Sequence, residues 1–133
     1  MTPMGSRVKH AVLAEDVYTG KQMVFEQVED RSEFQIQLDH VVSLSDAFTS
    51  GGWWWSPSGY NWANLANDPG NLLAVSRTVN AAKGDKNVAQ WLPNNPAHDF
   101  RRRFVITQIQ IKSRYRLSVT ASEAAAIRSL LEA

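Results

Sequence analysis

The chain contains no cysteine, and this absence removes several classes of chemistry. Disulfide bonds, thiolate nucleophiles and zinc sites built from cysteine are all excluded. The redox compartment stays open, because a chain without cysteine folds in an oxidising or a reducing environment. Long apolar runs are missing as well: no segment approaches the roughly 20 apolar residues that a membrane-spanning helix needs.

A strong excess of either charge is also absent, since 14 Lys and Arg residues balance 13 Asp and Glu residues to give a net charge of +1. This balance argues against a polybasic protein and leaves any affinity for nucleic acid to a local patch. The densest basic patch is Arg101-Arg102-Arg103. The beginning of the chain lacks the charged-then-apolar order of a secretory signal. The compartment therefore stays open, with the cytoplasm slightly favoured.

The length and apolar content predict one small globular domain. With 133 residues, 44% of them hydrophobic, and five tryptophans, the chain can bury one core but hardly two. Residues 1–10 resemble a loose leader, and residues 11–133 form the predicted domain. Such a leader is compatible with an upstream domain in a longer parent protein.

Short strand and helix signals alternate along the chain, which predicts an α+β fold with additional C-terminal helices. Residues 34–38 alternate apolar and polar side chains, as in a half-buried strand, and end beside Asp39 and His40. Ser76 is a suitable N-cap and Gly84 a suitable end for a short helix. The predicted elements are a hairpin turn at 18–21, a strand at 34–38, helices at 43–50 and 56–66, a strand at 72–75, a helix at 76–84, and helices at 97–115 and from 120 onward.

His40 and three other polar residues supply the chemistry for hydrolysing a phosphodiester. That reaction needs a base that takes a proton from water near neutral pH, so His40 is the predicted general base. Asp39 points to the opposite face of an extended strand, where it suits a divalent cation, and Asn80 offers a second, neutral oxygen. Two protein oxygens suit one Mg²⁺ or Mn²⁺ ion, which keeps much of its hydration, better than Zn²⁺. Asn71 is the predicted partner that accepts a hydrogen bond from the imidazole and orients it.

Basic residues in and after this region are candidates for phosphate contacts. Lys83 lies three residues after Asn80, on the same side of the predicted helix, and Lys86 follows it. The run Arg101-Arg102-Arg103 could also hold phosphates. For all of these residues a solvated helix face is an equally good explanation. The tryptophans at 53–55 could stack on bases, although packing over the following helix is the favoured interpretation.

Four ordered motifs give the chain a resemblance to a known family. They are D-H-V-V-x-L at 39–44, N-D-P-x-N-L at 67–72, N-x-x-K-G-D-K at 80–86 and W-L-P at 91–93. With these motifs the chain resembles the bacterial HNH endonucleases of the His-Me finger superfamily, and in particular the small domains that end modified-DNA restriction enzymes. Two features differ from that pattern: Ser43 stands where relatives usually have proline, and the cysteines that many relatives carry are absent.

The resemblance implies a ββα-metal core and a metal-dependent endonuclease that hydrolyses DNA and leaves 5′-phosphate and 3′-hydroxyl ends. It implies His40 as general base, Asp39 and Asn80 as ligands of one divalent ion, and Asn71 as the middle residue that fixes the histidine. Two other functions stay open: a nuclease toxin or effector with an immunity partner, and a nucleic-acid-binding module without catalysis. The binding module is disfavoured, because it would normally have lost Asp39, His40 or Asn80. RNA as a substrate stays open as well.

Overall fold

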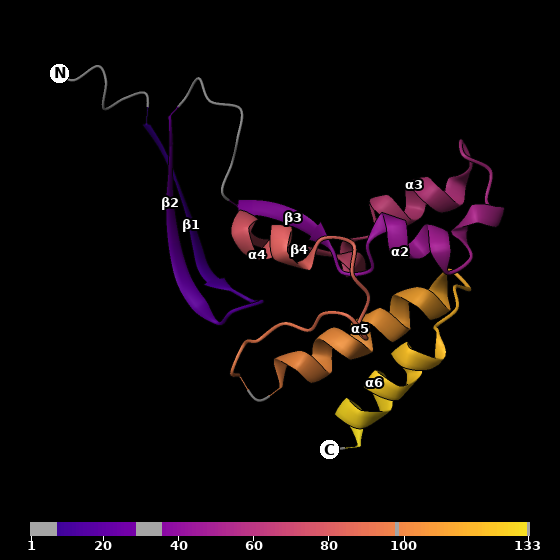
Figure 1. The fold of residues 1–133 in the computed structure, drawn as a ribbon. Helices are drawn as coiled ribbons and strands as arrows, with labels where there is room; N and C mark the ends of the chain where they lie inside the picture. The colour runs from indigo at the N-terminus through magenta and orange to yellow at the C-terminus, as the bar shows by residue number, and fades with distance from the viewer. Residues whose placement is uncertain (1–7, 29–35, 98, 133) are drawn as a thin grey trace.

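The computed structural model describes residues 8–28, 36–97 and 99–132, without the side chains of residues 8–14 and 23–28. Figure 1 shows a β-hairpin, a second pair of short strands and a group of helices, which confirms the predicted α+β class. Most of the predicted leader, and residues 34 and 35 of the predicted strand, lie outside the described residues, whereas residues 8–10 begin the first strand. The elements are β1 (Val8–Asp16), β2 (Lys21–Val28), β3 (Ile36–His40), α2 (Leu44–Thr49), the 3-10 turn η1 (Gly52–Trp54), α3 (Tyr60–Ala66), the 3-10 turn η2 (Pro69–Asn71), β4 (Leu72–Ser76), α4 (Arg77–Lys83), α5 (Phe100–Arg114) and α6 (Ala121–Leu131).

The strands β1 and β2 pair as an antiparallel hairpin, as the sequence predicts. The carbonyl oxygen of Asp16 closes the turn by accepting hydrogen bonds from the amides of Thr19 and Gly20 at 3.0 and 2.7 Å. Gly20 has a φ of +77°, a left-handed conformation that glycine adopts without strain. The turn directs Tyr18 into the core, where its fully buried ring packs edge-on against Phe104. The turn end of the hairpin approaches the helices, while its other end extends away from them (Figure 1).

The strands β3 and β4, followed by α4, form the predicted ββα unit. The two strands are antiparallel, with Asp39 opposite Leu73 and His40 opposite Leu72. The side chain of Ser76 caps α4, because it accepts a hydrogen bond from the backbone amide three residues later at 3.2 Å. The helix ends at a glycine with a φ of +54°, as the sequence predicts. The local signals therefore place the end of β3, where Asp39 and His40 lie, beside the start of β4.

The helix α3 begins later than the sequence predicts. A helix is expected over 56–66, but α3 starts at Tyr60. The preceding residues close a tight turn in which the amide of Gly59 donates to the carbonyl of Ser56 at 2.9 Å. Ser56 therefore belongs to a turn, and Gly59, with extended backbone angles, occupies the N-cap position of the helix.

The three consecutive tryptophans divide between the core and the surface. Trp55 packs edge-on against Trp62, with 4.8 Å between ring centroids. Trp53 and Trp54 stack on each other at 4.6 Å and keep 53% and 76% of their surface exposed. The packing interpretation is therefore right for Trp55 and wrong for Trp53 and Trp54.

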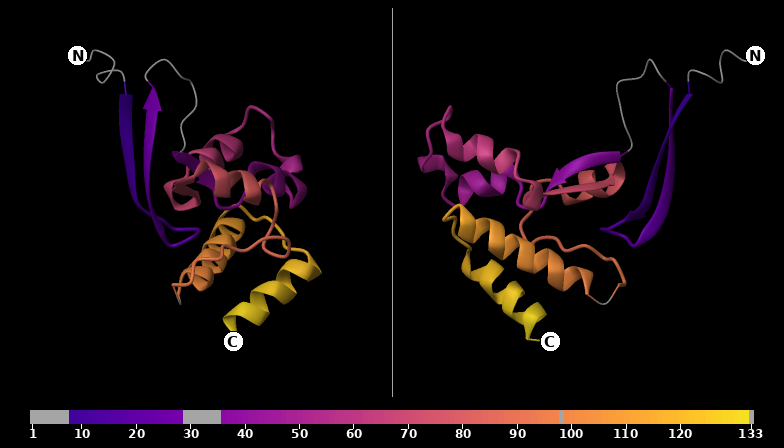
Figure 2. Two further views of the ribbon diagram at one scale, coloured as in Figure 1. Left: turned by 60° about the vertical axis from the view of Figure 1, so that its left-hand side comes forward. Right: turned by 180° about the vertical axis from the view of Figure 1, so that it is seen from behind.

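The helices α5 and α6 lie side by side on one side of the ββα unit (Figures 1 and 2). The predicted helix at 97–115 begins at Phe100, and Phe100 and Phe104 are buried as their spacing predicts. The predicted capping box starts α6: the amide of Glu123 donates to the hydroxyl of Thr120, and the amide of Thr120 donates to the carboxylate of Glu123, both at 3.0 Å. Among the described residues, no helix is long and apolar enough to cross a bilayer.

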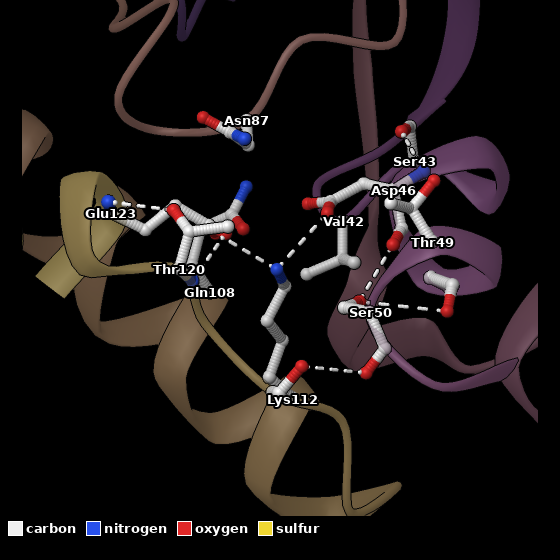
Figure 3. Close-up of polar contacts among 12 residues, drawn as sticks. Val42, Ser43, Asp46, Thr49, Ser50, Asn87, Gln108, Lys112, Thr120 and Glu123 are labelled. Carbon is white, nitrogen blue, oxygen red and sulfur yellow. Dashed lines mark hydrogen bonds and ion pairs between the residues drawn. The ribbon is translucent and has the colours of Figure 1, made fainter.

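A buried lysine connects the C-terminal helices to α2. Figure 3 shows Lys112 reaching from α5 between two carboxylates, with its Nζ 3.0 Å from Asp46 and 2.8 Å from Glu123. All three side chains are at least nine-tenths buried. Burial raises the pKa of Asp46, and the ammonium of Lys112 opposes that rise. The cluster therefore fixes α2, α5 and α6 relative to one another.

Candidate active site

His40 is the last residue of β3 and is half-buried. Its Nε2 lies 2.9 Å from the carbonyl oxygen of Ala66, the last residue of α3. Because a carbonyl oxygen only accepts hydrogen bonds, Nε2 is the donor, and the neutral ring carries its lone pair on Nδ1. The contact with Ala66 therefore fixes the tautomer and leaves Nδ1 as the atom that can accept a proton.

Asn71 does not contact the imidazole of His40, so the predicted contact is wrong. Its side chain is fully buried, and its Oδ1 accepts from the amide of Val42 at 2.8 Å while its Nδ2 donates to the carbonyl of Val42 at 3.1 Å. Its own carbonyl accepts from the amide of Val41 at 2.8 Å. The register explains this arrangement: His40 pairs with Leu72, so the residue before β4 faces the residues after β3. Asn71 therefore positions the backbone that follows His40.

Asp39 lies on the opposite face of β3, as predicted, and its side chain is buried among polar partners. The hydroxyl of Tyr18 donates to Oδ2 of Asp39 at 2.5 Å. The Nζ of Lys83 lies 3.1 Å from Oδ2 and 3.4 Å from Oδ1. Burial, followed by the charge of Asp39, raises the pKa of Tyr18, so the phenol stays protonated and donates. The carboxylate is therefore held from two sides, by the hairpin turn and by α4.

Lys83 is fully buried, and the prediction that it meets a phosphate is wrong. Besides contacting Asp39, its Nζ donates to the carbonyl oxygen of His40 at 2.9 Å. The cause is the packing of α4 against β3, which directs the last residue of the helix toward the end of the strand. Lys83 thus joins the side chain of one candidate catalytic residue to the backbone of the next.

Asn80 lies on the same side of the ββα unit as Asp39. Its Nδ2 donates to Oε1 of Gln37 at 3.1 Å. Gln37 and Asp39 are two residues apart on a strand and therefore point to the same face. The Oδ1 of Asn80 accepts no hydrogen bond from the part of the chain that the structure describes, so this oxygen is available to a ligand.

The donor set on this face suits a hydrated hard cation. Among the described residues, Oδ1 of Asp39 has one polar partner, the Nζ of Lys83 at 3.4 Å, and Oδ1 of Asn80 accepts no hydrogen bond. Over the described residues, no cluster of three or more His, Cys, Asp or Glu side chains could hold a metal. Mg²⁺ and Mn²⁺ accept one or two protein oxygens together with water and phosphate oxygens, whereas Zn²⁺ requires more protein ligands. The residues present therefore fit the predicted Mg²⁺ or Mn²⁺ ion.

An open groove runs along α3 and the turn that follows it. Its volume is about 630 Å³, and it continues along α3 from Asn67, the neighbour of Ala66. Across the groove, Arg114 donates to Oδ2 of Asp68 at 2.7 Å and keeps 52% of its side chain exposed. The residues that line it are Asn61, Ala63, Asn64, Asn67, Asp68, Pro69, Arg114 and Tyr115.

Asp68 organises one wall of this groove. Its Oδ2 also accepts from the hydroxyl of Tyr115 at 2.8 Å, and its Oδ1 accepts from the amide of Gly70 at 2.9 Å. Burial tends to raise the pKa of Asp68, but the hydrogen bonds from Arg114, Tyr115 and Gly70 outweigh it and lower that pKa. Asp68 is therefore an anion that holds Arg114 at the edge of the groove.

The predicted basic patch on α5 is exposed and tied to nearby groups. Arg101 donates to the carbonyl of Pro93 at 2.5 Å, and Arg102 donates to the carbonyl of Leu131 at 3.0 Å. Arg103 pairs with Asp99 at 3.4 Å, with both side chains 64% exposed. These contacts favour the solvated-face explanation for all three arginines.

Two of the predicted basic residues, Arg103 and Lys86, differ in what they contact near the site. Arg103 lines a cavity of about 250 Å³ together with Val41 and Leu72, which adjoin His40 along and across the sheet. Lys86 is exposed and donates to the carbonyl of Ala82 at 3.1 Å. Of these two exposed residues, Arg103 is therefore the one that shares a cavity with the neighbours of His40.

Sequence reasoning missed several of the residues around the candidate site, among them Tyr18, Arg114 and Ala66. Tyr18 carried one signal, because a large aromatic residue inside a hairpin turn needs a buried site. Arg114 carried no signal in the sequence, since it resembles any basic residue in the last turn of a helix. Ala66 acts through its backbone carbonyl, which no side-chain pattern reveals.

Comparison with known proteins identifies the family. The family described as GmrSD restriction endonucleases, C-terminal domain, matches residues 6–130, and the chain belongs to it. An uncharacterized secreted protein of Arthroderma benhamiae is 40% identical over 98 residues, which are 72% of this chain and 46% of that protein. The chain thus spans about half the length of this relative. No solved structure matches. Family membership confirms the resemblance to HNH-type nucleases and places the chain among the C-terminal domains of restriction endonucleases.

Proposed function

We propose that this chain is a metal-dependent HNH endonuclease that hydrolyses phosphodiester bonds of DNA. The single observation that carries the proposal is the state of His40, whose Nε2 is committed to Ala66 while Nδ1 is left as the acceptor. This base lies at the end of β3, next to Asp39, in a ββα unit of the kind that the family resemblance implies. A nuclease needs these groups together, since base and cation must act on one phosphate.

His40 has the role of general base. Its Nδ1 removes a proton from a water molecule as the water oxygen bonds to phosphorus. The bond between phosphorus and the 3′ oxygen then breaks, and solvent returns a proton to that oxygen. The products are a 5′-phosphate and a 3′-hydroxyl, as the family resemblance implies. Ala66 keeps the ring oriented throughout, because its carbonyl holds the Nε2 proton.

Asp39 and Asn80 would hold one Mg²⁺ or Mn²⁺ ion. When bound, that ion stabilises the negative charge of the transition state and of the leaving oxygen. Tyr18 and Lys83 keep the carboxylate of Asp39 in place, and Gln37 keeps the amide of Asn80 in place. Asn71 acts indirectly, because its side chain fixes the backbone of Val42, which follows His40 in the chain.

The groove along α3 is the proposed path of one DNA strand. Asn67, which follows Ala66 in the chain, lines it, and the exposed guanidinium of Arg114 at its edge suits a phosphate. Asn61, Asn64 and Asn67 supply amide groups that can bind sugar or phosphate oxygens without reading sequence. The positive charge offered to the DNA is thus a local feature of the groove, which agrees with the nearly neutral net charge of the whole chain.

The experiment that tests the proposal is incubation of the purified protein with supercoiled plasmid. Reactions contain Mg²⁺, Mn²⁺ or a chelator, and His40→Ala serves as the inactive control. Nicking that requires the ion and His40 supports the proposal. Absence of cleavage under every ionic condition, by a protein shown to be folded, would contradict it.

A further inference from the structure

Lys83 stands out in the candidate site because the proposed mechanism gives its ammonium no direct part. It is fully buried, yet its Nζ lies 3.1 Å from Oδ2 of Asp39 and 2.9 Å from the carbonyl oxygen of His40. Its place is fixed by α4, in which it is the last residue. A lysine in this position acts directly on the charge that the proposed metal ligand offers.

The pair formed by Asp39 and Lys83 carries no net charge. The one charged ligand proposed for the ion is Asp39, and the second ligand, Asn80, is neutral. Tyr18 also donates to Oδ2 of Asp39, and a phenol that donates this hydrogen bond adds no charge to the site. The affinity of an oxygen site for a divalent cation rises with the number of its negative ligands. A site whose only carboxylate is paired with an ammonium therefore attracts a dication weakly.

A DNA phosphate would change this balance. It adds a negative charge and further oxygen ligands, and Mg²⁺ is commonly held by one or two carboxylates together with substrate phosphates. We propose that Lys83 neutralises Asp39 so that the divalent ion binds tightly only together with a DNA phosphate. The inference rests on the proposed metal site and adds the order in which that site is filled.

Substituting Lys83 tests the charge directly. In Lys83→Met a neutral side chain of similar length leaves the carboxylate of Asp39 without its counter-charge. The expected result is that Mn²⁺, measured by calorimetry without DNA, binds the variant at least tenfold more tightly than the wild type. Lys83→Arg retains the positive charge and should keep the weak affinity of the wild type.

Tyr18→Phe is the matched control for loss of a hydrogen bond without loss of charge. It removes the hydroxyl that donates to Asp39 but leaves Lys83 in place. Its Mn²⁺ affinity without DNA should not rise, because the variant loses a hydrogen bond that positions Asp39 while the charge of the site is unchanged. A tightening in Tyr18→Phe equal to that in Lys83→Met would overturn the charge argument.

A second measurement needs no change at Lys83 and so does not depend on that variant folding. Mn²⁺ binding to His40→Ala, which keeps the DNA intact, is measured with and without a short DNA duplex. The ion should bind at least tenfold more tightly with the duplex present. Equal, tight binding with and without DNA would overturn the inference while leaving the metal site standing. Absence of Mn²⁺ binding in every sample would instead remove the metal site itself, and the inference with it.

Discussion

Asn71 holds the backbone of Val42 from both sides, with its Oδ1 and Nδ2 bonded to the amide and carbonyl of that residue at 2.8 and 3.1 Å. The middle residue of the motif set therefore shapes the chain that leaves β3. His40 receives its orientation from Ala66 instead. A residue that acts through the backbone affects folding and catalysis together, and this combination is measurable.

Asn71→Ala should lower both stability and activity. The substitution leaves two backbone groups of Val42 without partners, and an unsatisfied buried polar group costs about 1–3 kcal/mol. Urea unfolding measures the loss. Asn67→Ala is the control, because the side chain of Asn67 is exposed and donates to the carbonyl of Ala63 at the surface. An unfolding midpoint for Asn71→Ala equal to that of the control would contradict the structural role.

Lys112→Ala should be among the most destabilising single changes in the chain. It leaves Asp46 and Glu123 buried without a counter-charge, and breaking a buried ion pair in this way costs about 3–5 kcal/mol. The comparison is Arg103→Ala, which breaks an exposed pair with Asp99 and should cost about 0–1 kcal/mol. Similar unfolding midpoints for the two variants would argue against the bridging role of Lys112.

Asp46 predicts a specific pH dependence of stability. Its pKa in the folded protein is raised above the ordinary value of 3.8, so the folded state binds its proton more tightly than the unfolded state. This contribution favours folding at low pH and is lost as the pH rises through the folded pKa. The free energy of unfolding of the wild type, relative to that of Asp46→Asn, should therefore fall over the interval in which the pH rises from the ordinary value of 3.8 through the folded pKa. A relative stability that rises over this interval would contradict the direction of the shift.

Asp39→Ala should remove most binding of the divalent ion, and Asn80→Ala should weaken it and strongly reduce cleavage. Asp39 supplies the charged oxygen and Asn80 the neutral one. Calorimetry with Mn²⁺ in the presence of a DNA duplex, in a His40→Ala background, measures the effect. Asp85→Ala controls for general loss of negative charge, since Asp85 is exposed just after α4. Unchanged affinity in Asp39→Ala would refute the ligand assignment.

Arg114→Gln should weaken DNA binding at the groove. Loss of one phosphate contact lowers the slope of log affinity against log salt concentration by about 1. Arg102→Gln, on the exposed face of the same helix, should leave the slope unchanged. Fluorescence anisotropy over a salt series distinguishes the two. Identical slopes for wild type and Arg114→Gln would place the strand elsewhere.

The sequence predicted those parts of the fold that depend on neighbouring residues. The cap at Ser76 and the capping box of Thr120 and Glu123 involve residues three positions apart, so local patterns reveal them. The start of α3 was missed because a Ser-Pro pair fits a turn as well as a helix start, and the turn closed at Gly59.

The partners of the candidate site were harder to predict, because they come from distant parts of the chain. Lys83 reaches a carboxylate 44 residues away, and Lys112 reaches one 66 residues away. On a short helix a lysine beside a glycine resembles a solvated residue, and only the packing of α4 on β3 buries it. The candidates Asp39, His40 and Asn80 were predicted from their order in the chain, which is a local feature of the sequence.

The most direct test of the central claim is single-turnover cleavage of DNA by His40→Ala across a pH series, with folding checked by circular dichroism. If His40 is the general base, the variant should lose about two to four orders of magnitude in rate. It should still bind Mn²⁺ in the presence of DNA, and the wild-type dependence of rate on pH should disappear. Cleavage at nearly the wild-type rate with the same pH profile would show that another group activates the water.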